Sequence, residues 1–248
     1  MFQAFQLFLL ALLGSVIALF GGFVFLFNRR LSGLLERHSI PFAAGVLVTV
    51  SLLGLLPESE HIIGENAFWI VAVSFLGAYL FEHFFFVIHH HEDGEHVKGM
   101  EFPIPLVIIG DTIHNFIDGV AIAASFFISP GLGLVTAIST FLHEVPHEIG
   151  DFGILLKAGW KKGKIVVVNI LSSLTTILGA FLIYFFSESE SLNGTLMAVS
   201  AGIFLYLGAS DFLPKIEKDE KHRFRSIIPL ILGASLMIAI FLLVPHEH

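Results

Sequence analysis

Cysteine is absent from this chain of 248 residues. This absence excludes disulfide bonds and thiolate metal ligands, and it says nothing further about the cellular compartment. Charged residues are scarce as well: they make up 14% of the chain against 55% for hydrophobic residues, and the mean hydropathy is +0.86. Several apolar runs approach the roughly 20 residues that span a bilayer. The composition therefore predicts an integral, polytopic membrane protein in which one bundle of helices is the structural unit.

The apolar runs predict an all-α bundle of eight transmembrane helices that forms a single domain over residues 1–248. The predicted spans lie at about 3–27, 41–63, 67–88, 103–128, 132–157, 164–186, 194–214 and 226–244. No Lys or Arg precedes the first run, and Arg29 and Arg30 follow it. We therefore expect a retained span there rather than a cleaved signal peptide.

Lys and Arg are missing from the second, fourth and sixth predicted loops and from both ends of the chain. All 13 basic residues lie in or beside the other four loops. The positive-inside rule then places those four loops in the cytoplasm and both termini outside. The basic clusters are short and have no aromatic residues among them, so we expect a lipid bilayer and no nucleic acid as partner. The cell (inner) membrane is the expected location, with a homodimer as a candidate assembly.

Residues 89–101, in the third and therefore cytoplasmic loop, read HHHEDGEHVKGME. Neutral imidazole and carboxylate both bind divalent ions, so His89, His90, His91 and His96 are candidate ligands of a loosely held metal. The alternative is a solvated polar linker.

Two polar motifs interrupt the fourth and fifth predicted spans: HNFIDG at residues 114–119 and HEVPHEIGD at residues 143–151. An ionisable group in hydrocarbon costs roughly 2.5–3.5 kcal/mol on insertion scales, so these groups must face one another or a cavity. Helical spacing puts the polar residues of the fourth span on one stripe: Asp111, His114, Asn115, Asp118 and Ser125. It aligns Thr136, Thr140, His143 and His147 on the fifth span, with Glu144, Glu148 and Asp151 on the adjacent strip.

If the two stripes face each other, a metal site forms between the spans. The predicted ligands are His114, Asp118, His143 and His147. Three nitrogens and one oxygen suit Zn²⁺, and Fe²⁺ or Mn²⁺ with less preference. Asn115, Glu144 and Glu148 are candidates for a second, oxygen-richer position or for supporting these ligands. Pro146 cannot donate a backbone hydrogen bond, so we expect it to kink the fifth helix.

HEVPH also matches H-E-x-x-H, the zinc protease motif, which intramembrane proteases place within a span. Glu144 would then be the general base on an unbroken helical turn. Pro146 disrupts that turn, and HNFIDG supplies more ligands than a protease needs. Both features argue against proteolysis. A transport path through the bundle is one alternative, and a metal-sensing or structural metal-binding membrane protein is another.

HNFIDG followed by HEVPHEIGD resembles the signature of the ZIP (Zrt- and Irt-like) divalent metal transporters, in the branch with HExPHExGD. The segments GLLPESEH (residues 54–61) and SAGIFLYLGASDFLPK (residues 200–215) are similar as well. The resemblance implies spans arranged as three, two and three, outer triplets related by inverted symmetry, and a binuclear site between the fourth and fifth spans. The primary position would be His114, Asp118, His143 and His147, with Asn115 and Glu144 at the neighbouring one.

The resemblance also implies a transporter rather than an enzyme. It would move Zn²⁺, with Fe²⁺, Mn²⁺ or Cd²⁺ as further candidates, into the cytoplasm by alternating access at a midplane site. No organic cofactor is expected. One departure weakens the second position, because some relatives carry a carboxylate on the sixth span. Here that span offers only Asn169, Ser172, Ser173, Thr175 and Thr176.

Overall fold

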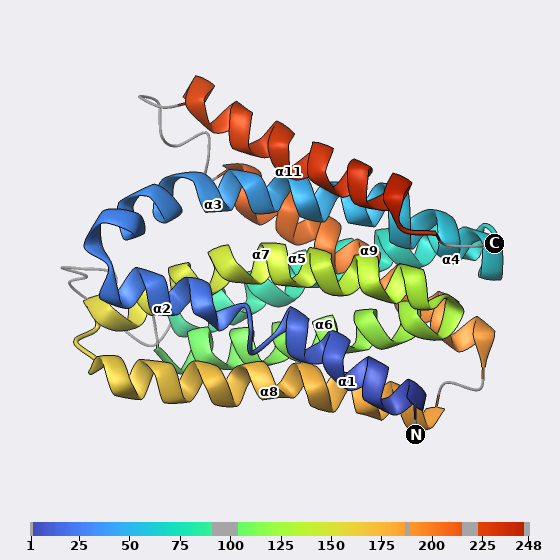
Figure 1. Cartoon of the computed structure of the whole chain (residues 1–248), viewed down its shortest axis with the longest axis horizontal. Coiled ribbons are helices and arrows are strands. Elements are labelled where there is room, and N and C mark those ends of the chain that lie inside the picture. Colours follow the sequence, from blue (N-terminus) through green and yellow to red (C-terminus); the bar gives the residue numbers. More distant parts are fainter. Residues whose placement is uncertain (1, 91–103, 187–188, 215–222, 246–248) are drawn as a thin grey trace.

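The computed structural model describes residues 2–90, 104–186, 189–214 and 223–245, and every regular element among them is a helix (Figure 1). Seven helical stretches in this described part of the chain are long and apolar enough to cross a membrane: Phe2–Phe27, His38–Ile63, Asn66–Phe84, Ile104–Ile128, Lys162–Phe186, Glu190–Phe212 and Ser226–Leu243. The predicted all-α membrane bundle is confirmed. The range predicted as the fifth span is helical too, as α7 (Pro130–Lys157), but it is not among the seven. The count of eight spans therefore stays a prediction.

The first stretch is broken into α1 (Phe2–Gly14) and α2 (Leu19–Phe27) by a turn at residues 15–18. The Ser15 hydroxyl donates to the carbonyl of Ala11 at 2.6 Å, which satisfies an acceptor near the break. A Cβ at Gly14 would lie 2.9 Å from the Ile122 side chain and 3.0 Å from that of Thr140. The break is thus packed against α6 (Ile104–Ile128) and α7, the two helices that carry the polar motifs.

Two long helices change register near their C-terminal ends. In one, α3 (Arg29–Val50) continues through a π-helical segment, η1 (Ser51–Leu55), into α4 (Leu56–Ile63). In the other, α9 (Glu190–Tyr206) continues into a second π-helical segment, η2 (Leu207–Phe212). A Leu-Pro pair follows each π segment. Because proline cannot donate to the carbonyl four residues earlier, a local change of hydrogen-bond register accommodates it.

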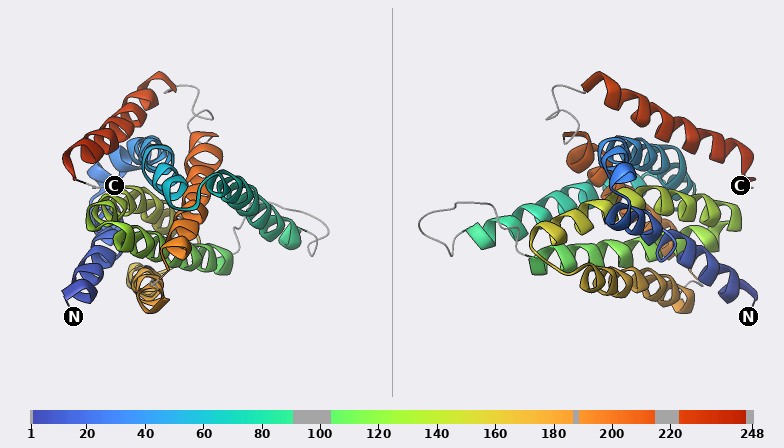
Figure 2. Two further views of the ribbon diagram at one scale, coloured as in Figure 1. Left: turned by 90° about the vertical axis from the view of Figure 1, so that its right-hand side faces the viewer. Right: turned by 60° about the vertical axis from the view of Figure 1, so that its left-hand side comes forward.

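The remaining helices are α5 (Asn66–His90), α8 (Lys162–Phe186) and α11 (Arg223–Leu243), and each lies along one of the helices already described. In pairs, α8 lies along α6, α11 along α3, and α5 along α9, while α7 contacts α1, α2, α3 and α6 (Figure 2). A Cβ at Gly119 would clash with the carbonyl oxygen of Thr176, and one at Gly179 with that of Phe116. The backbones of α6 and α8 therefore touch, as small residues permit in membranes.

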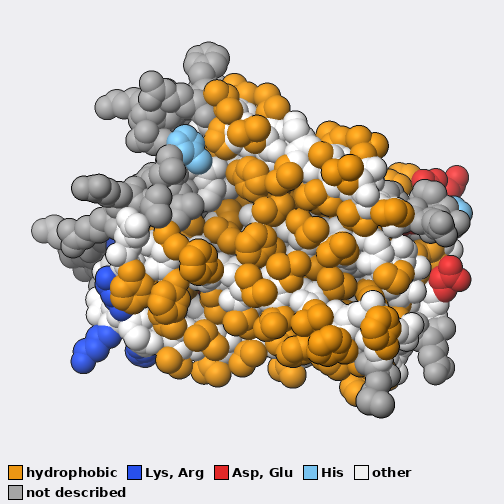
Figure 3. Space-filling model, in the orientation of Figure 1, with side chains coloured by type: hydrophobic (Ala, Val, Ile, Leu, Met, Phe, Trp, Pro, Cys, Tyr) orange, Lys and Arg blue, Asp and Glu red, His pale blue; other side chains and the backbone are white. Residues whose placement is uncertain are grey.

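The surface is divided as a membrane protein requires. Figure 3 shows a broad apolar belt with lysines at one end and acidic side chains at the other. Large apolar side chains such as Trp69 (73%) and Phe20 (72%) are exposed. A soluble monomer rarely shows an apolar patch as continuous as this belt. The lysines with described side chains, Lys157, Lys161, Lys162 and Lys164, flank the turn between α7 and α8, at the end opposite both termini (Figure 1).

Candidate metal centre

Helices α6 and α7 bring their polar motifs together inside the bundle. On α6 the residues Asp111, His114, Asn115 and Asp118 are all buried. On α7, His143, Glu144 and Glu148 are completely buried, Asp151 is nearly so, and the side chain of His147 is 21% exposed. Polar groups at such depth are stable only if they pair or bind an ion, so their mutual geometry decides what the centre does.

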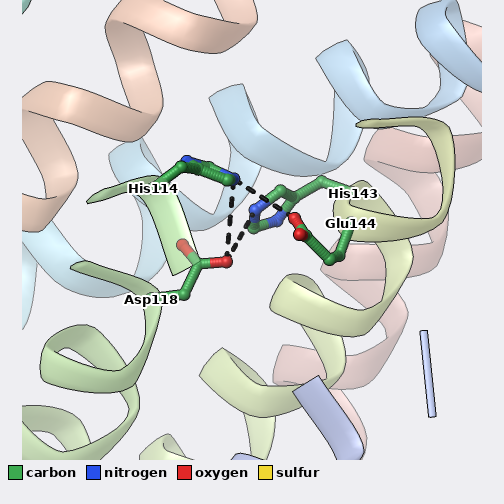
Figure 4. A group of neighbouring side chains, drawn as sticks. All are labelled: His114, Asp118, His143 and Glu144. Atoms are coloured by element: carbon green, nitrogen blue, oxygen red, sulfur yellow. Dashed lines mark ion pairs between the residues drawn. The ribbon is translucent and has the colours of Figure 1, made fainter. Parts of the chain in front are cut away.

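Four of these side chains converge on one point (Figure 4). They are His114, Asp118, His143 and Glu144, and one ligand atom from each lies within 4.8 Å of the others. The His143 Nε2 atom is 3.3 Å from Asp118 Oδ2. The His114 Nε2 atom is 3.3 Å from Glu144 Oε2 and 3.7 Å from Asp118 Oδ2.

These separations match the spacing between ligands of a metal ion. In a tetrahedral zinc site with bonds of about 2.0–2.2 Å, neighbouring ligand atoms lie about 3.3–3.6 Å apart. The same distances are too long for good hydrogen bonds. Among the described residues, His114 Nε2, His143 Nε2, Glu144 Oε2 and both Asp118 oxygens have no hydrogen-bond partner. Two nitrogens and two oxygens, buried and turned toward one another, form a donor set suited to Zn²⁺.

A hydrogen bond to the backbone fixes the orientation of the His143 ring. Its Nδ1 atom lies 2.9 Å from the carbonyl oxygen of Ser139, one turn earlier on α7. Because a carbonyl only accepts, the proton sits on Nδ1 and the lone pair is on Nε2, where the other ligands converge. The Phe204 ring of α9 packs edge-on against the imidazole, with centroids 5.3 Å apart.

Two further groups continue from this point along α6 and α7. One contains Asp111, His147 and Asp151, and the other contains Asp111, Glu144 and Glu148. The His147 Nδ1 atom is 4.0 Å from Asp111 Oδ1 and 3.8 Å from Asp151 Oδ2. Because Glu144 and Asp111 each belong to two groups, the three groups form a connected series.

Asn115 links the series by hydrogen bonds. Its Nδ2 atom donates to Asp111 Oδ1 at 2.9 Å and to Glu144 Oε1 at 3.0 Å, while its Oδ1 atom accepts from the Thr176 hydroxyl at 3.0 Å. The amide therefore joins α6 and α7 to the neighbouring α8.

A cavity of about 730 Å³ borders the series on the side of α5 and α9. Its lining contains Asp111, His114, His147 and Asp151 from the polar motifs, and Glu82, Tyr206 and Asp211 from the opposite wall. It reaches Leu106 and Ile154, which lie on α6 and α7 toward the lysine-bearing end (Figure 1). On the far wall the Tyr206 hydroxyl donates to Glu82, joining α9 to α5.

The sequence is similar to those of known proteins. The family model of ZIP zinc transporters matches residues 89–241, more than half of the chain. The chain belongs to the ZIP zinc transporter family. Zinc transporter foi of Drosophila melanogaster is 34% identical over 141 residues, which cover 55% of this chain and 20% of that protein. Human zinc transporter ZIP4 is 39% identical over 113 residues (46% and 18%), and human zinc transporter ZIP10 is 38% identical over 151 residues (55% and 18%). The chain spans about a fifth of the length of these curated relatives.

The predicted site residues of this ZIP chain are distributed over the three groups. Of the four ligands predicted for one ion, the structure brings His114, Asp118 and His143 together. Their fourth neighbour is Glu144, and His147 lies with Asp111 and Asp151 instead. The rings of His147 and His114 are stacked, with centroids 4.6 Å apart, so the two groups are adjacent.

The other predicted residues lie beyond the three ligand groups or outside the residues that the structure describes. Thr136 donates to Ser125 at 3.0 Å, which joins the stripes of α7 and α6 beyond the ligands. In the predicted metal-binding loop, His91 and His96 lie outside the described residues, and so do the side chains of His89 and His90 in the last turn of α5. The contact between the Ser139 carbonyl and His143 was not predicted from the sequence, although Ser139 lies one helical turn before the histidine.

Proposed function

We propose that this ZIP chain transports divalent metal cations, with Zn²⁺ as the main substrate, across a membrane into the cytoplasm. The observation that carries the proposal is the group of His114, Asp118, His143 and Glu144. It is buried within a membrane bundle and has the ligand spacing of a tetrahedral zinc site. The names of the relatives, all zinc transporters, support zinc. Fe²⁺, Mn²⁺ and Cd²⁺ remain candidate substrates.

The connected ligand groups support a path rather than a permanent metal site. We call His114, Asp118, His143 and Glu144 the first group. An ion held there can exchange one ligand at a time for those of the other two groups, because Glu144 and Asp111 each belong to two of the three groups. The cavity beside Asp111 and His147 offers a route toward the lysine-bearing end. Under the positive-inside rule that end is cytoplasmic. We therefore propose uptake into the cytoplasm by alternating access, with the cavity as the release side.

The membrane location and the assembly predicted from the sequence are part of the same proposal. Both termini would lie outside the cytoplasm, in the cell (inner) membrane. The outer helices would form two inverted triplets, an idea supported by the π segments followed by Leu-Pro in α3–α4 and α9–η2. A homodimer is proposed as the assembly, to be checked by light scattering on the purified protein.

The protease alternative is not supported. In a zinc protease of the H-E-x-x-H type, both histidines hold one zinc ion and the glutamate faces a bound water. Here His143 and His147 belong to different ligand groups. Glu144 accepts a hydrogen bond from Asn115 and lies among the ligands of the first group. Members of the ZIP family are transporters, and we propose no enzymatic activity.

Zinc uptake into sealed vesicles that contain the purified protein tests the proposal. We expect saturable uptake of Zn²⁺, with Fe²⁺, Mn²⁺ and Cd²⁺ as competitors, and no cleavage of peptide substrates. Asp118→His exchanges an oxygen ligand for nitrogen, so it should shift preference away from Mn²⁺ and toward softer ions. Glu144→Gln keeps an oxygen ligand, so it should retain part of the uptake, whereas a protease would lose all turnover. No uptake of any of these ions by inserted, folded protein would refute transport.

A further inference from the structure

A groove of about 420 Å³ lies beside the interruption between α1 and α2. One wall comes from the interruption and from α2, the other comes from α8, and α7 contributes between them. Every described side chain in the lining is apolar, including Phe20, Phe23, Phe152, Val166 and Ile170. Phe20 is 72% exposed, so the open side of the groove faces the hydrocarbon of the membrane.

Both walls of the groove end at Lys162. On α8, Lys162, Val166 and Ile170 are spaced by four residues and share one face of the helix. On α2, the Phe23 and Phe27 rings pack with centroids 5.3 Å apart, and Lys162 Nζ lies 4.8 Å from the centroid of the Phe27 ring. From Lys162 to Ile170 the helix rises about 12 Å, which is most of the roughly 15 Å of hydrocarbon in one leaflet.

The surface at this end of the groove is positively charged. The exposed basic side chains around the turn between α7 and α8 are Lys157, Lys161, Lys162 and Lys164. Residues 152–186 contain no Asp or Glu. Lys162 donates to the Leu26 carbonyl at 2.5 Å, which uses one of its three donors and leaves two for another acceptor. A basic cluster beside a membrane-spanning helix attracts anionic lipids.

We propose that the groove binds one acyl chain of an anionic phospholipid whose phosphate lies against Lys162, with Lys161 and Lys164 adding to the attraction. An apolar hollow takes hydrocarbon rather than water, and a phospholipid supplies both the chain and the negative charge. In the proposed topology this lipid belongs to the cytoplasmic leaflet. The site is separate from the metal centre and goes beyond the proposed transport function.

A lipid held in the groove would stabilise the contact between α2 and α7. Phe152 lines the groove and packs closely against α2, because a Cβ at Gly22 would lie 2.8 Å from the Phe152 ring. The preceding residue, Asp151, belongs to one of the ligand groups of the metal centre. An acyl chain adds packing beside this contact, so we expect the bound lipid to raise the unfolding temperature.

Native mass spectrometry of the purified chain in zinc-free detergent solution tests the charged part of the site. Dioleoyl phosphatidylglycerol and dioleoyl phosphatidylcholine are compared, because they share their acyl chains and differ in headgroup charge. The parent should retain phosphatidylglycerol preferentially. Lys162→Gln should lower the affinity for phosphatidylglycerol about fivefold, the effect of one lysine near a membrane surface, and Lys162→Arg should preserve it. Lys157→Gln removes the same charge outside the two walls; as the matched control it should stay within about twofold of the parent, because salt screens the more distant charge.

A second pair of variants tests the groove itself. Ile170→Trp fills the groove from α8 and should lower the affinity for phosphatidylglycerol about tenfold or more, since each displaced CH₂ group is worth about fourfold. Leu171→Trp, at the neighbouring exposed position outside the lining, is the control and should keep the affinity of the parent. Thermal unfolding without lipid checks that both variants are folded. In the same assay phosphatidylglycerol should raise the unfolding midpoint of the parent, and inorganic phosphate should not, because it lacks the acyl chain.

Each of the other outcomes overturns the proposal. Equal retention of the two lipids by the parent would show that the headgroup charge is not recognised. Equal losses in Lys162→Gln and Lys157→Gln would indicate a general effect of surface charge. Undiminished binding by Ile170→Trp would place the lipid outside the groove, and stabilisation by phosphate alone would indicate an anion site without a chain. None of these results bears on the proposed transport function, because zinc is absent from the measurements.

Discussion

Replacing His143 with alanine removes one of the four candidate ligands that converge in the first group, which consists of His114, Asp118, His143 and Glu144. The imidazole is completely buried, its Nε2 atom lies 3.3 Å from Asp118 Oδ2, and Nδ1 is bonded to the Ser139 carbonyl. Alanine leaves a space lined by Phe204 and by a carboxylate that has lost its neighbour. We expect zinc binding and uptake to be nearly abolished, with the fold of the membrane bundle retained.

The expected loss of zinc affinity can be estimated from the role of His143 as a candidate ligand. Loss of a residue that merely supports a metal ligand typically lowers affinity 10–100-fold, so loss of a ligand should lower it at least about 100-fold. At a zinc concentration about 100 times the dissociation constant of the unmodified protein, binding stabilises that protein by about 2.7 kcal/mol. At the same concentration the variant would be only half saturated, and its stabilisation would fall to about 0.4 kcal/mol.

Thermal unfolding in detergent with and without zinc measures this difference. For a protein of this size about 1 kcal/mol corresponds to 2–4 °C, so zinc should raise the unfolding midpoint by roughly 5–11 °C in the unmodified protein and by about 1 °C in the variant. Any destabilisation from the cavity affects both conditions and cancels. His61→Ala, an exposed histidine on α4, is the control and should keep the full shift. An undiminished zinc-induced shift in His143→Ala would show that the first group does not bind the ion.

Three further outcomes are expected. A cysteine at Ser191 should react with an impermeant thiol reagent added outside intact cells and one at Gly163 should not, and the reverse pattern would invert the proposed topology. Glu148→Gln removes a buried carboxylate whose oxygens have no hydrogen-bond partner among the described residues. The free energy of unfolding of the metal-free protein should therefore rise by roughly 1–3 kcal/mol, and a decrease would contradict this reasoning. Gly119→Ala places a methyl group against a backbone carbonyl of α8, so thermal unfolding should show the protein destabilised by about 1–3 kcal/mol or more. Gly110→Ala, on the same helix but with open space around it, is the control and should not destabilise the protein. Equal effects of the two changes would refute the tight contact.

Hydropathy located the helices because membrane burial depends on composition over long windows. It missed features that depend on local contacts. The interruption at residues 15–18 lies in a continuous apolar run and becomes evident only from the packing of Gly14 against α6 and α7. The helix that leads into the second span begins at Arg29, earlier than the predicted residue 41, because a polar stretch can be helical without being inserted.

Helical periodicity placed the candidate ligands on facing stripes, but it could not determine which of them lie close together in one group. Residues 143 and 147 lie about 40° apart around a helix, and residues 143 and 144 about 100° apart, so spacing alone favours His147 as the partner of His143. The structure instead places Glu144 beside His114, because α6 approaches the face of α7 between positions 143 and 144. The contact of Thr176 with Asn115, across 61 residues, likewise needs the three-dimensional packing.

The histidines of the centre differ in freedom, and this difference suits an ion that must leave. His143 is held by the Ser139 carbonyl and the Phe204 ring and has no exposed surface. His147 is 21% exposed, borders the cavity and stacks on His114. A site built only from fixed ligands would bind tightly and release slowly. A partly exposed imidazole adjacent to the fixed group lets an ion exchange one ligand at a time, so that no step leaves it without donors in the membrane interior. In the proposed transport cycle, His143 therefore contributes affinity and His147 contributes exchange with the cavity.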